Sequence, residues 1–271
     1  MLFSKTTPLV LGNYIKFFYS FTAKSIEVEG LRHRRLPDGT LDVVFNLGSP
    51  AWQSGRNASA EKMPKIVVTG LYAAENYIQY TGDVHFIGAV FQPGAAHLFV
   101  NDNLAQFRQC AYAAENIFGN SIYNLLEQMH ITGTEPEKHQ LLESYLIGQL
   151  RKMKDRYAFD KILMAVRQID TLHGNIKMPD LYLNIYMGER HFRRIFDEYV
   201  GMNAKQYAGI IRLTSYSRLH QDYGKKPAAL LYKLGFTDHS HLNKEFQRIA
   251  GTSPKNFFSE HNQTRIYSHL V

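Results

Sequence analysis

Two short clusters of polar and basic side chains in the last third of the chain have the chemistry of surfaces that read DNA. The first cluster consists of Arg190, Arg193 and Arg194. Arginine offers a planar fork of N–H donors that matches the O6 and N7 acceptors of guanine. The second cluster mixes histidine, serine and lysine, which contact base edges and phosphates less strictly. Its members are His239, Ser240, His241 and Lys244.

Helical periodicity places each cluster on an amphipathic helix, with the polar side chains opposite an apolar stripe. The two stripes are Phe192, Ile195, Phe196 and Tyr199, and Leu242, Phe246, Ile249 and Ala250. Each helix is expected to stop at a glycine, Gly201 or Gly251, because glycine adopts the left-handed conformation of a helix end without strain. Asn203 and Ser253 can then cap the helices that follow.

Both helices belong to an internal repeat with a period of 50 residues. The pairs that match are Phe192 with Leu242, Phe196 with Phe246, Val200 with Ala250, Gly201 with Gly251, Lys205 with Lys255 and Tyr207 with Phe257. A shorter apolar segment and a tight turn precede each helix, at residues 179–188 and 228–237. The repeat therefore predicts two helix-turn-helix units, whose second helices can each enter a major groove.

The distribution of charge agrees with a polyanionic partner for this part of the chain. Residues 1–173 hold 17 Lys and Arg against 16 Asp and Glu, a net charge of +1. Residues 174–271 hold 14 against 8, a net charge of +6. A compact basic module gains affinity for nucleic acid when phosphate contacts release counterions. The alternative is a merely solubilising surface, on which Arg193 and Arg194 would pair with Asp197 and Glu198 along the helix.

The chain to about residue 110 reads as strands and turns. A β-rich run at 41–47 follows the turn at Pro37, Asp38 and Gly39, and another lies at 65–72. Runs at 77–80 and 84–91 flank the turn at 81–83 and predict a hairpin. Helical spacing begins near Asn116 and ends with a helix over 159–169. The loop that closes at Gly174 is the predicted domain boundary.

The C-terminal hundred residues resemble the DNA-binding domain of the AraC/XylS family of bacterial transcription regulators. The segments that carry the resemblance are residues 234–242 with Phe246 and 251–254, residues 192–196 with Gly201 and Met202, and residues 206–207 with 211–213. The resemblance implies seven helices, a long helix joining the two units, and DNA contacts at the seven residues of the two clusters. Tyr182 and Leu231 stand where the family has alanine, and residues 186–188 lack its usual small polar cap.

The N-terminal half is similar to a β-rich domain found ahead of AraC-type modules. The similar segments are residues 36–47 and 88–96, and the likeness extends over about residues 10–120. It implies a sensory or regulatory role without naming a ligand. A local interpretation of residues 91–94 as a plain turn is equally open.

Enzymatic interpretations have weaker support. His33, His85 and His97 lack the spacing of a metal site, and His239 and His241 diverge on a helix by about 200°. Cys110 is the single cysteine, which excludes an internal disulfide and favours a reducing cytoplasm. We interpret it as a small buried apolar residue rather than a nucleophile. Neither a phosphate-binding glycine loop nor a membrane-spanning apolar stretch is present in the sequence.

The sequence therefore predicts an α+β protein in three parts. An antiparallel, barrel- or cupin-like β-rich domain covers residues 1–115, a helical connector with a dimerisation role covers 116–173, and an all-α tandem helix-turn-helix domain covers 174–271. We expect a cytoplasmic, non-enzymatic DNA-binding transcription regulator, without cofactor or metal. The sequence leaves both an activator and a repressor open. Double-stranded DNA is the expected partner, and a small-molecule effector, RNA polymerase and a second copy of the chain are further candidates. A non-DNA-binding interaction protein or a cupin-like enzyme is the alternative.

Overall fold

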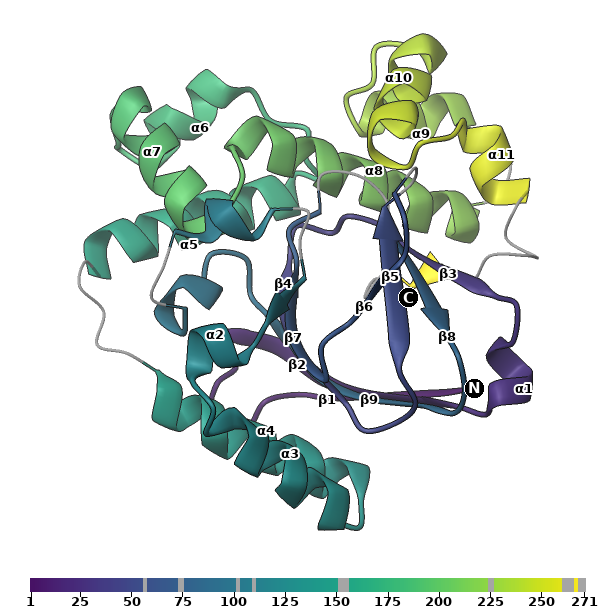
Figure 1. Ribbon diagram of the computed structural model, residues 1–271. Helices are drawn as coiled ribbons and strands as arrows, with labels where there is room; N and C mark the ends of the chain where they lie inside the picture. Colours follow the sequence, from purple (N-terminus) through teal and green to yellow (C-terminus); the bar gives the residue numbers. More distant parts are fainter. Residues whose placement is uncertain are drawn as a thin grey trace.

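A computed structural model describes residues 1–55, 58–72, 76–100, 103–108, 111–150, 156–223, 227–259 and 266–267. Two β-sheets form the N-terminal part, and helices cover it on two sides. The pair α3 and α4 lies at one end of the sheets, and the helices from α5 onward lie at the other (Figure 1). This arrangement confirms the predicted β-rich domain followed by connecting and C-terminal helices. None of the helices in the described ranges is long and apolar enough to cross a membrane.

The two sheets have different strand orders. The first runs β1-β2-β9-β4-β7-β10 and the second β11-β3-β8-β5-β6. The strands of the first sheet are β1 (Leu2–Thr6), β2 (Ile15–Ala23), β4 (Leu41–Asn46), β7 (Ile66–Gly70), β9 (Val84–Phe91) and β10 (Tyr112–Ala113). Those of the second are β3 (Arg32–Arg35), β5 (Ala51–Gly55), β6 (Glu61–Lys62), β8 (Asn76–Tyr80) and β11 (Ile266–Tyr267). The pairs are antiparallel except β11 with β3, which is parallel.

The first sheet is apolar on both faces, because alternate side chains of a strand point to opposite sides. In β2, Phe17, Tyr19 and Phe21 pack toward residues of the second sheet, such as Ala51. Phe18 of the same strand belongs to a larger core that also contains buried residues of the helices, from Leu125 to Phe257. The N-terminal sheet and the C-terminal helices therefore share one continuous hydrophobic core.

The predicted hairpin of residues 77–80 and 84–91 is wrong. Both runs are strands, but β8 pairs with β3 and β5, whereas β9 pairs with β2 and β4. Asp83 holds the connection outside both sheets: its carboxylate accepts from the Lys24 side chain at 2.9 Å and from the Ser25 backbone N–H at 2.8 Å. Thr81 also donates to the carbonyl of Pro50. Residues 81–83 thus carry the chain from one sheet to the other.

Buried polar contacts fix α4 (Glu135–Gln149) against the first sheet. The Glu143 carboxylate accepts from the backbone N–H groups of residues 9–11 at 2.8 to 3.1 Å. The His139 ring lies between two hydroxyls, with Nδ1 2.8 Å from Thr6 Oγ1 and Nε2 2.8 Å from Ser20 Oγ. Thr134 caps the helix through a reciprocal bond with Glu137. The helices that precede α4 in the chain are α2 (Glu115–Phe118) and α3 (Ile122–Ile131). The remaining short elements of the N-terminal part are α1 (Ser25–Val28) and the 3-10 turns η1 (Ala96–Leu98) and η2 (Leu104–Phe107).

Six helices lie within the described part of residues 174–271, and α5 (Arg156–Thr171) packs against two of them, α7 and α8. The six are α6 (Met178–Asn184), α7 (Glu189–Val200), α8 (Ala204–Tyr223), α9 (Pro227–Lys233), α10 (His239–Ile249) and α11 (Pro254–Ser259). The described part of this range therefore holds six of the seven helices that the family resemblance implies, and α5 precedes it. The predicted boundary at Gly174 lies after α5 and stays a prediction.

Candidate nucleic-acid interface

The first helix-turn-helix unit consists of α6 and α7. Leu181 of α6 is fully buried beside Phe192 and Phe196 of α7, so the shorter helix supports the longer one. The ring of Tyr182 packs 5.2 Å from that of Phe192, which accommodates the large residue at the position where the family has alanine. At the start of α7, Gly188 provides no side-chain cap, as its residue type predicts.

All three arginines of the first cluster are exposed on α7. Arg193 forms an ion pair with Glu189, and its Nε lies 3.4 Å from the hydroxyl of Tyr182. Arg194 pairs with Glu198 at 3.2 Å. The expected Arg194–Glu198 pair is therefore present, whereas Arg193 pairs with Glu189 and not with Asp197. The two side chains remain 66% and 63% exposed, so neither pair removes its guanidinium from solvent.

The second unit consists of α9 and α10. Leu231 of α9 is buried together with Phe236 of the turn. Asp238 caps α10: its carboxylate accepts from the His241 backbone N–H at 2.7 Å, and this bond keeps the pKa of Asp238 below its ordinary value. The exposed side chains of the helix are polar or basic, as predicted. They are His239, Ser240, Asn243, Lys244, Gln247 and Arg248.

His241 is the member of the second cluster that lies partly inside. Its ring contacts that of Phe236 edge-on at 5.4 Å, and its Nδ1 lies 3.4 Å from Thr237 Oγ1. His239 and Ser240 are exposed beside it at the start of α10. The structure therefore brings the second cluster to one helix end, with His241 half-buried.

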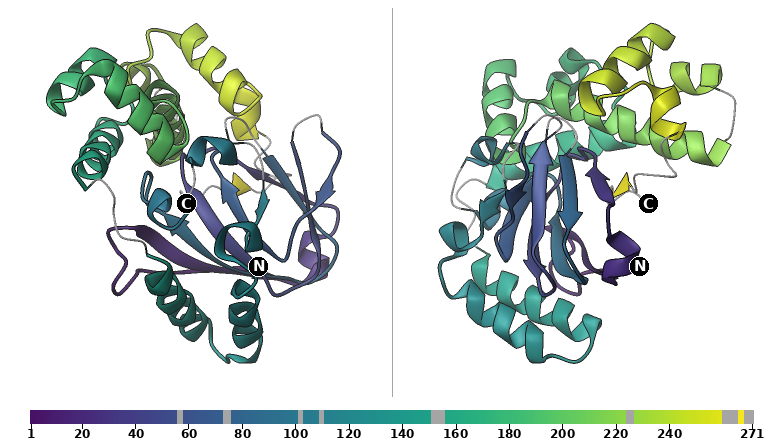
Figure 2. Two further views of the ribbon diagram at one scale, coloured as in Figure 1. Left: turned by 60° about the vertical axis from the view of Figure 1, so that its left-hand side comes forward. Right: turned by 45° about the vertical axis from the view of Figure 1, so that its right-hand side comes forward.

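The long helix α8 joins the two units. Near its start, Tyr207 packs against Phe196 of the first unit with ring centroids 6.1 Å apart. Past the middle of α8, the ring of Tyr216 contacts the rings of Phe236 and Phe246 of the second unit, with centroid distances of 6.1 and 5.6 Å. The two views of Figure 2 show the units on either side of α8, both at the end of the molecule remote from α3 and α4. The predicted connecting helix is thus confirmed.

The histidines weighed as metal ligands lie in three separate environments. His33 contacts the ring of Tyr80, His85 pairs with Glu135 at 3.1 Å, and His97 lies against the ring of Tyr199. The described residues contain no group of three side chains suited to hold a metal ion. Cys110 lies outside the described residues.

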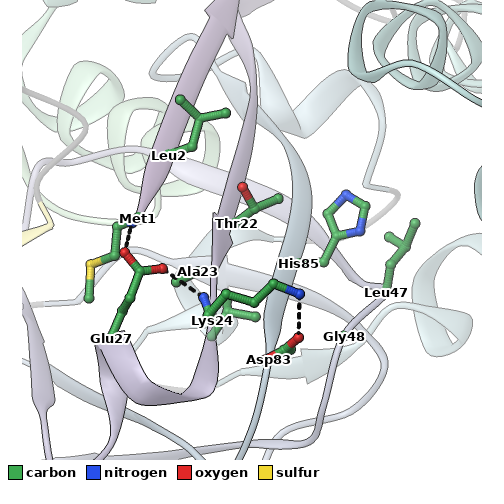
Figure 3. Close-up of a pocket in the computed structure, with 11 residues that line it drawn as sticks. Met1, Leu2, Thr22, Ala23, Lys24, Glu27, Leu47, Gly48, Asp83 and His85 are labelled. Carbon is green, nitrogen blue, oxygen red and sulfur yellow. Dashed lines mark hydrogen bonds and ion pairs between the residues drawn. The ribbon is translucent and has the colours of Figure 1, made fainter.

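Two hollows in the described surface are large enough to hold a small molecule. One, of about 490 Å³, lies at the edge of the first sheet beside Thr22 and His85 (Figure 3). Its charged groups are already paired, Lys24 with Asp83 and Glu27 with the amino group of Met1. The other, of about 220 Å³, lies between the two parts of the chain. Its polar lining includes Lys16, Asp38, Gln92, Asp170, His173 and Arg218.

A sequence profile described as "Helix-turn-helix domain" matches residues 184–260, the range that contains α7 to α11. The match covers α7 and α10, the second helices of the two units, and decides the class of the C-terminal part. The chain carries an AraC-type DNA-binding domain. A second profile, described as a domain of unknown function (DUF6597), matches residues 7–111 ahead of the AraC-type domain. The chain is accordingly a DNA-binding transcription regulator.

Several solved structures show weak similarity to most of the chain. ToxT from Vibrio cholerae O395 is 11% identical, with 89% of this chain and 97% of that chain covered and a TM-score of 0.45. ToxT from strain SCE256 with a bound unsaturated fatty acid is 12% identical, with 84% and 93% covered and a TM-score of 0.44. The AraC-like transcriptional activator CuxR is 12% identical, with 85% and 66% covered and a TM-score of 0.20. No curated protein sequence matches the chain.

Sequence reasoning missed the residues that connect the AraC-type domain to the N-terminal domain. Arg34 of β3 donates to the backbone carbonyl of Ala250, and Arg108 donates to the carbonyl of Gly201 and pairs with Asp197. These partners are separated by 216 and 93 positions. Local sequence pattern holds no signal for contacts at that separation. The one signal in the sequence is the arginine itself, because an arginine in a buried strand needs a hydrogen-bond partner, and Arg34 is such a residue.

Proposed function

We propose that this regulator reads two adjacent segments of the major groove, one with α7 and one with α10. The observation that carries the proposal is that both helices leave their polar and basic clusters exposed, except for the half-buried His241, while the N-terminal domain is in place. An exposed helix start with arginine, or with serine and lysine, can contact base edges and phosphates when it enters the groove. DNA contact would be made by Arg190, Arg193 and Arg194 in the first segment and by His239, Ser240, His241 and Lys244 in the second.

The existing ion pairs influence how the first segment would be read. Arg193 and Arg194 each have a glutamate partner on α7 in the free protein, and both pairs are well exposed. Exposed pairs of this kind contribute little to stability. Each guanidinium can therefore turn toward guanine at little expense, while Glu189 and Glu198 disfavour phosphate contacts by the same face. The first helix is thus suited to base contact more than to simple backbone binding.

The test begins with selection of duplexes from a random-sequence pool by the full chain. We expect enrichment of a bipartite site with half-elements about one helical turn apart, and an affinity that falls steeply with salt. Arg193→Ala combined with Arg194→Ala should relax the preference in one half-element only. Lys62→Ala, a change of an exposed lysine in β6, serves as the matched control. Absence of any salt-dependent duplex binding by the folded wild-type chain would refute the proposal.

The finer parts of the proposal concern the N-terminal domain. A small effector would enter the 220 Å³ hollow, since that space is bounded by both parts of the chain and has polar groups of both charges. The proposal assigns no catalytic step to the chain, and places its action in the cytoplasm. Contact with RNA polymerase and dimerisation are tested by transcription from the selected site in vitro and by sedimentation of the free chain.

A further inference from the structure

The N-terminal domain holds the end of the second recognition helix through a buried arginine. Arg34 of β3 is 3% exposed. Its guanidinium donates to the carbonyl oxygen of Ala250, the residue that closes α10, and lies 5.4 Å from the ring centroid of Phe257. The last carbonyls of a helix lack internal partners and carry partial negative charge. A guanidinium at this place satisfies one of them and stabilises the helix end.

A second arginine holds the first recognition helix in the same way. Arg108, which directly follows η2, donates through Nε to the carbonyl oxygen of Gly201, the residue that closes α7. Its Nη2 also pairs with Asp197, one turn before the helix end. Both partners of this pair are 39% exposed, so the contact at α7 is wetter than the contact at α10.

The two arginines donate hydrogen bonds to backbone carbonyls at neighbouring positions of the internal repeat. Val200 and Gly201 in the first unit match Ala250 and Gly251 in the second. Arg34 and Arg108, however, come from different elements of the N-terminal domain, β3 and the end of η2. One domain therefore contacts the same part of both units at once. Helix α8 connects the units directly, and the N-terminal domain supplies a second connection.

The first contact leaves no room for a side chain at position 201. Gly201 has φ of 78°, and a Cβ atom there would lie 2.5 Å from Leu71 Cδ1 and 2.9 Å from the carbonyl oxygen of Leu104. Both of these atoms belong to the N-terminal domain. By contrast, the proposed DNA-contacting residues lie on earlier turns of α7 and α10 and, apart from the half-buried His241, are exposed. The helices are held by their C-terminal ends and free at their reading surfaces.

We propose that the N-terminal domain sets the relative position of the two recognition helices through Arg34 and Arg108, and thereby the spacing of half-elements that the chain accepts. This inference rests on the proposed function. In this view the N-terminal domain positions the two recognition helices and does not mask their DNA-contacting surfaces. A signal that displaces β3 or η2 would change the spacing of half-elements that the chain accepts, although the helix starts that face DNA are already exposed.

The experiment uses the full chain and the duplex selected by the wild type. Base pairs are inserted between the half-elements up to five, which turns the second half-element by about half a helical turn. We expect wild-type affinity to fall about tenfold or more, since the second helix loses its contacts. The affinity of the Arg34→Met, Arg108→Met double variant should fall by about threefold or less, because the polar contacts that hold both helix ends to the N-terminal domain are then lost. The single change Arg108→Met gives an intermediate profile and involves a half-exposed side chain, so it serves if the double variant does not fold.

Two controls separate this inference from the proposed function. Lys62→Met, far from both contacts, should keep the wild-type spacing profile. Amide hydrogen exchange without DNA should be faster in the Arg108→Met chain at residues 197–202, and in the double variant also at 246–251. A spacing profile equal to the wild-type profile, with exchange unchanged, overturns the inference while leaving DNA binding intact. Failure of the wild type to bind any duplex refutes the proposed function, and the exchange measurement then still decides whether the contacts hold the helices.

Discussion

The hydroxyl of Tyr207 in α8 donates to Asp170 Oδ1 at the end of α5 over 2.9 Å. Tyr207 is 1% exposed, and its ring also lies directly beneath Gly39 of the N-terminal domain, where a Cβ atom would be 2.5 Å from Tyr207 Cε2. One side chain thus joins the connector, the AraC-type domain and the sheet domain. Because α5 is linked in this way to α8, it belongs structurally with the C-terminal helices.

Tyr207→Phe keeps the ring but removes the donor. Loss of this partly buried hydrogen bond should lower the free energy of unfolding by about 1 kcal/mol. Burial raises the pKa of Asp170, and the bond from Tyr207 opposes that rise. Asp170→Asn retains an acceptor for the hydroxyl and removes the charge, so it should be close to neutral at pH 7. Denaturant unfolding of both variants checks this, and equal destabilisation by the two changes would contradict it.

The docking of α4 predicts loss of stability in acid. Burial of Glu143 acts to raise its pKa, but three backbone donors outweigh it, so the pKa lies below the ordinary carboxyl value. The ionised Glu143 carboxylate contributes its full stability above the pKa of the unfolded chain, about 4.3. This contribution is lost as the pH falls through the pKa of the folded chain. Glu143→Gln should cost about 2 kcal/mol or more at pH 7, since charge-assisted bonds are lost.

His139 adds a second acid-sensitive contact at the same helix. Burial lowers its pKa, so the folded chain favours the neutral ring. Its contribution is present above the unfolded pKa, near about 6.5, and declines as pH falls toward the folded value. We expect the melting temperature of the wild type to drop as the pH falls below the ordinary histidine pKa. The drop should be smaller in His139→Gln, and an identical slope in both chains would argue against this role.

The C-terminal helices could be predicted closely because their determinants are local. The apolar stripe from Phe192 to Tyr199, the glycine at 201 and the cap at Asp238 each act within one or two turns, and the helices begin and end where these residues indicate. The 50-residue repeat added a second, independent copy of the same evidence. The DNA-contacting clusters followed from the same helices, since they occupy the faces that the stripes leave exposed.

The N-terminal sheets were predicted as strands but not as pairs. Residues 77–80 and 84–91 have the pattern of a hairpin, yet Asp83 binds Lys24 and Ser25, which are remote in sequence, and turns the chain into another sheet. The contact between Arg34 and Ala250 could not be predicted for the same reason, since its partners are 216 positions apart. Strand partners and interdomain contacts depend on which distant groups satisfy a buried charge or carbonyl, and a residue pattern does not record that.

Gly188 offers a way to strengthen the first unit. It begins α7 with φ of −60° and ψ of 139°, has no side-chain cap, and a Cβ atom there would meet nothing within 4 Å. Gly188→Ser should therefore stabilise the chain by about 0.5 kcal/mol, because serine caps the helix and restricts the unfolded chain. Gly188→Asp should stabilise similarly but weaken duplex binding, since it adds a negative charge at the reading end of α7. Thermal unfolding and binding of the two variants, compared side by side, test this; equal affinity for DNA would place Gly188 away from the duplex.

Lys244 tests whether α10 approaches the phosphate backbone. It is exposed on the same helix as His239 and Ser240, and a lysine acts on phosphate as a mobile point charge without reading bases. Lys244→Ala should weaken binding of the selected duplex and of unrelated duplexes by a similar factor. It should also reduce the slope of log affinity against log salt by about 1. Ser240→Ala, in contrast, should keep the slope and alter preference in one half-element. Lys62→Ala removes the same charge from β6 and should leave both quantities unchanged, so a slope that falls equally for Lys62 and Lys244 would mean that net charge alone, and not contact by α10, governs the salt dependence.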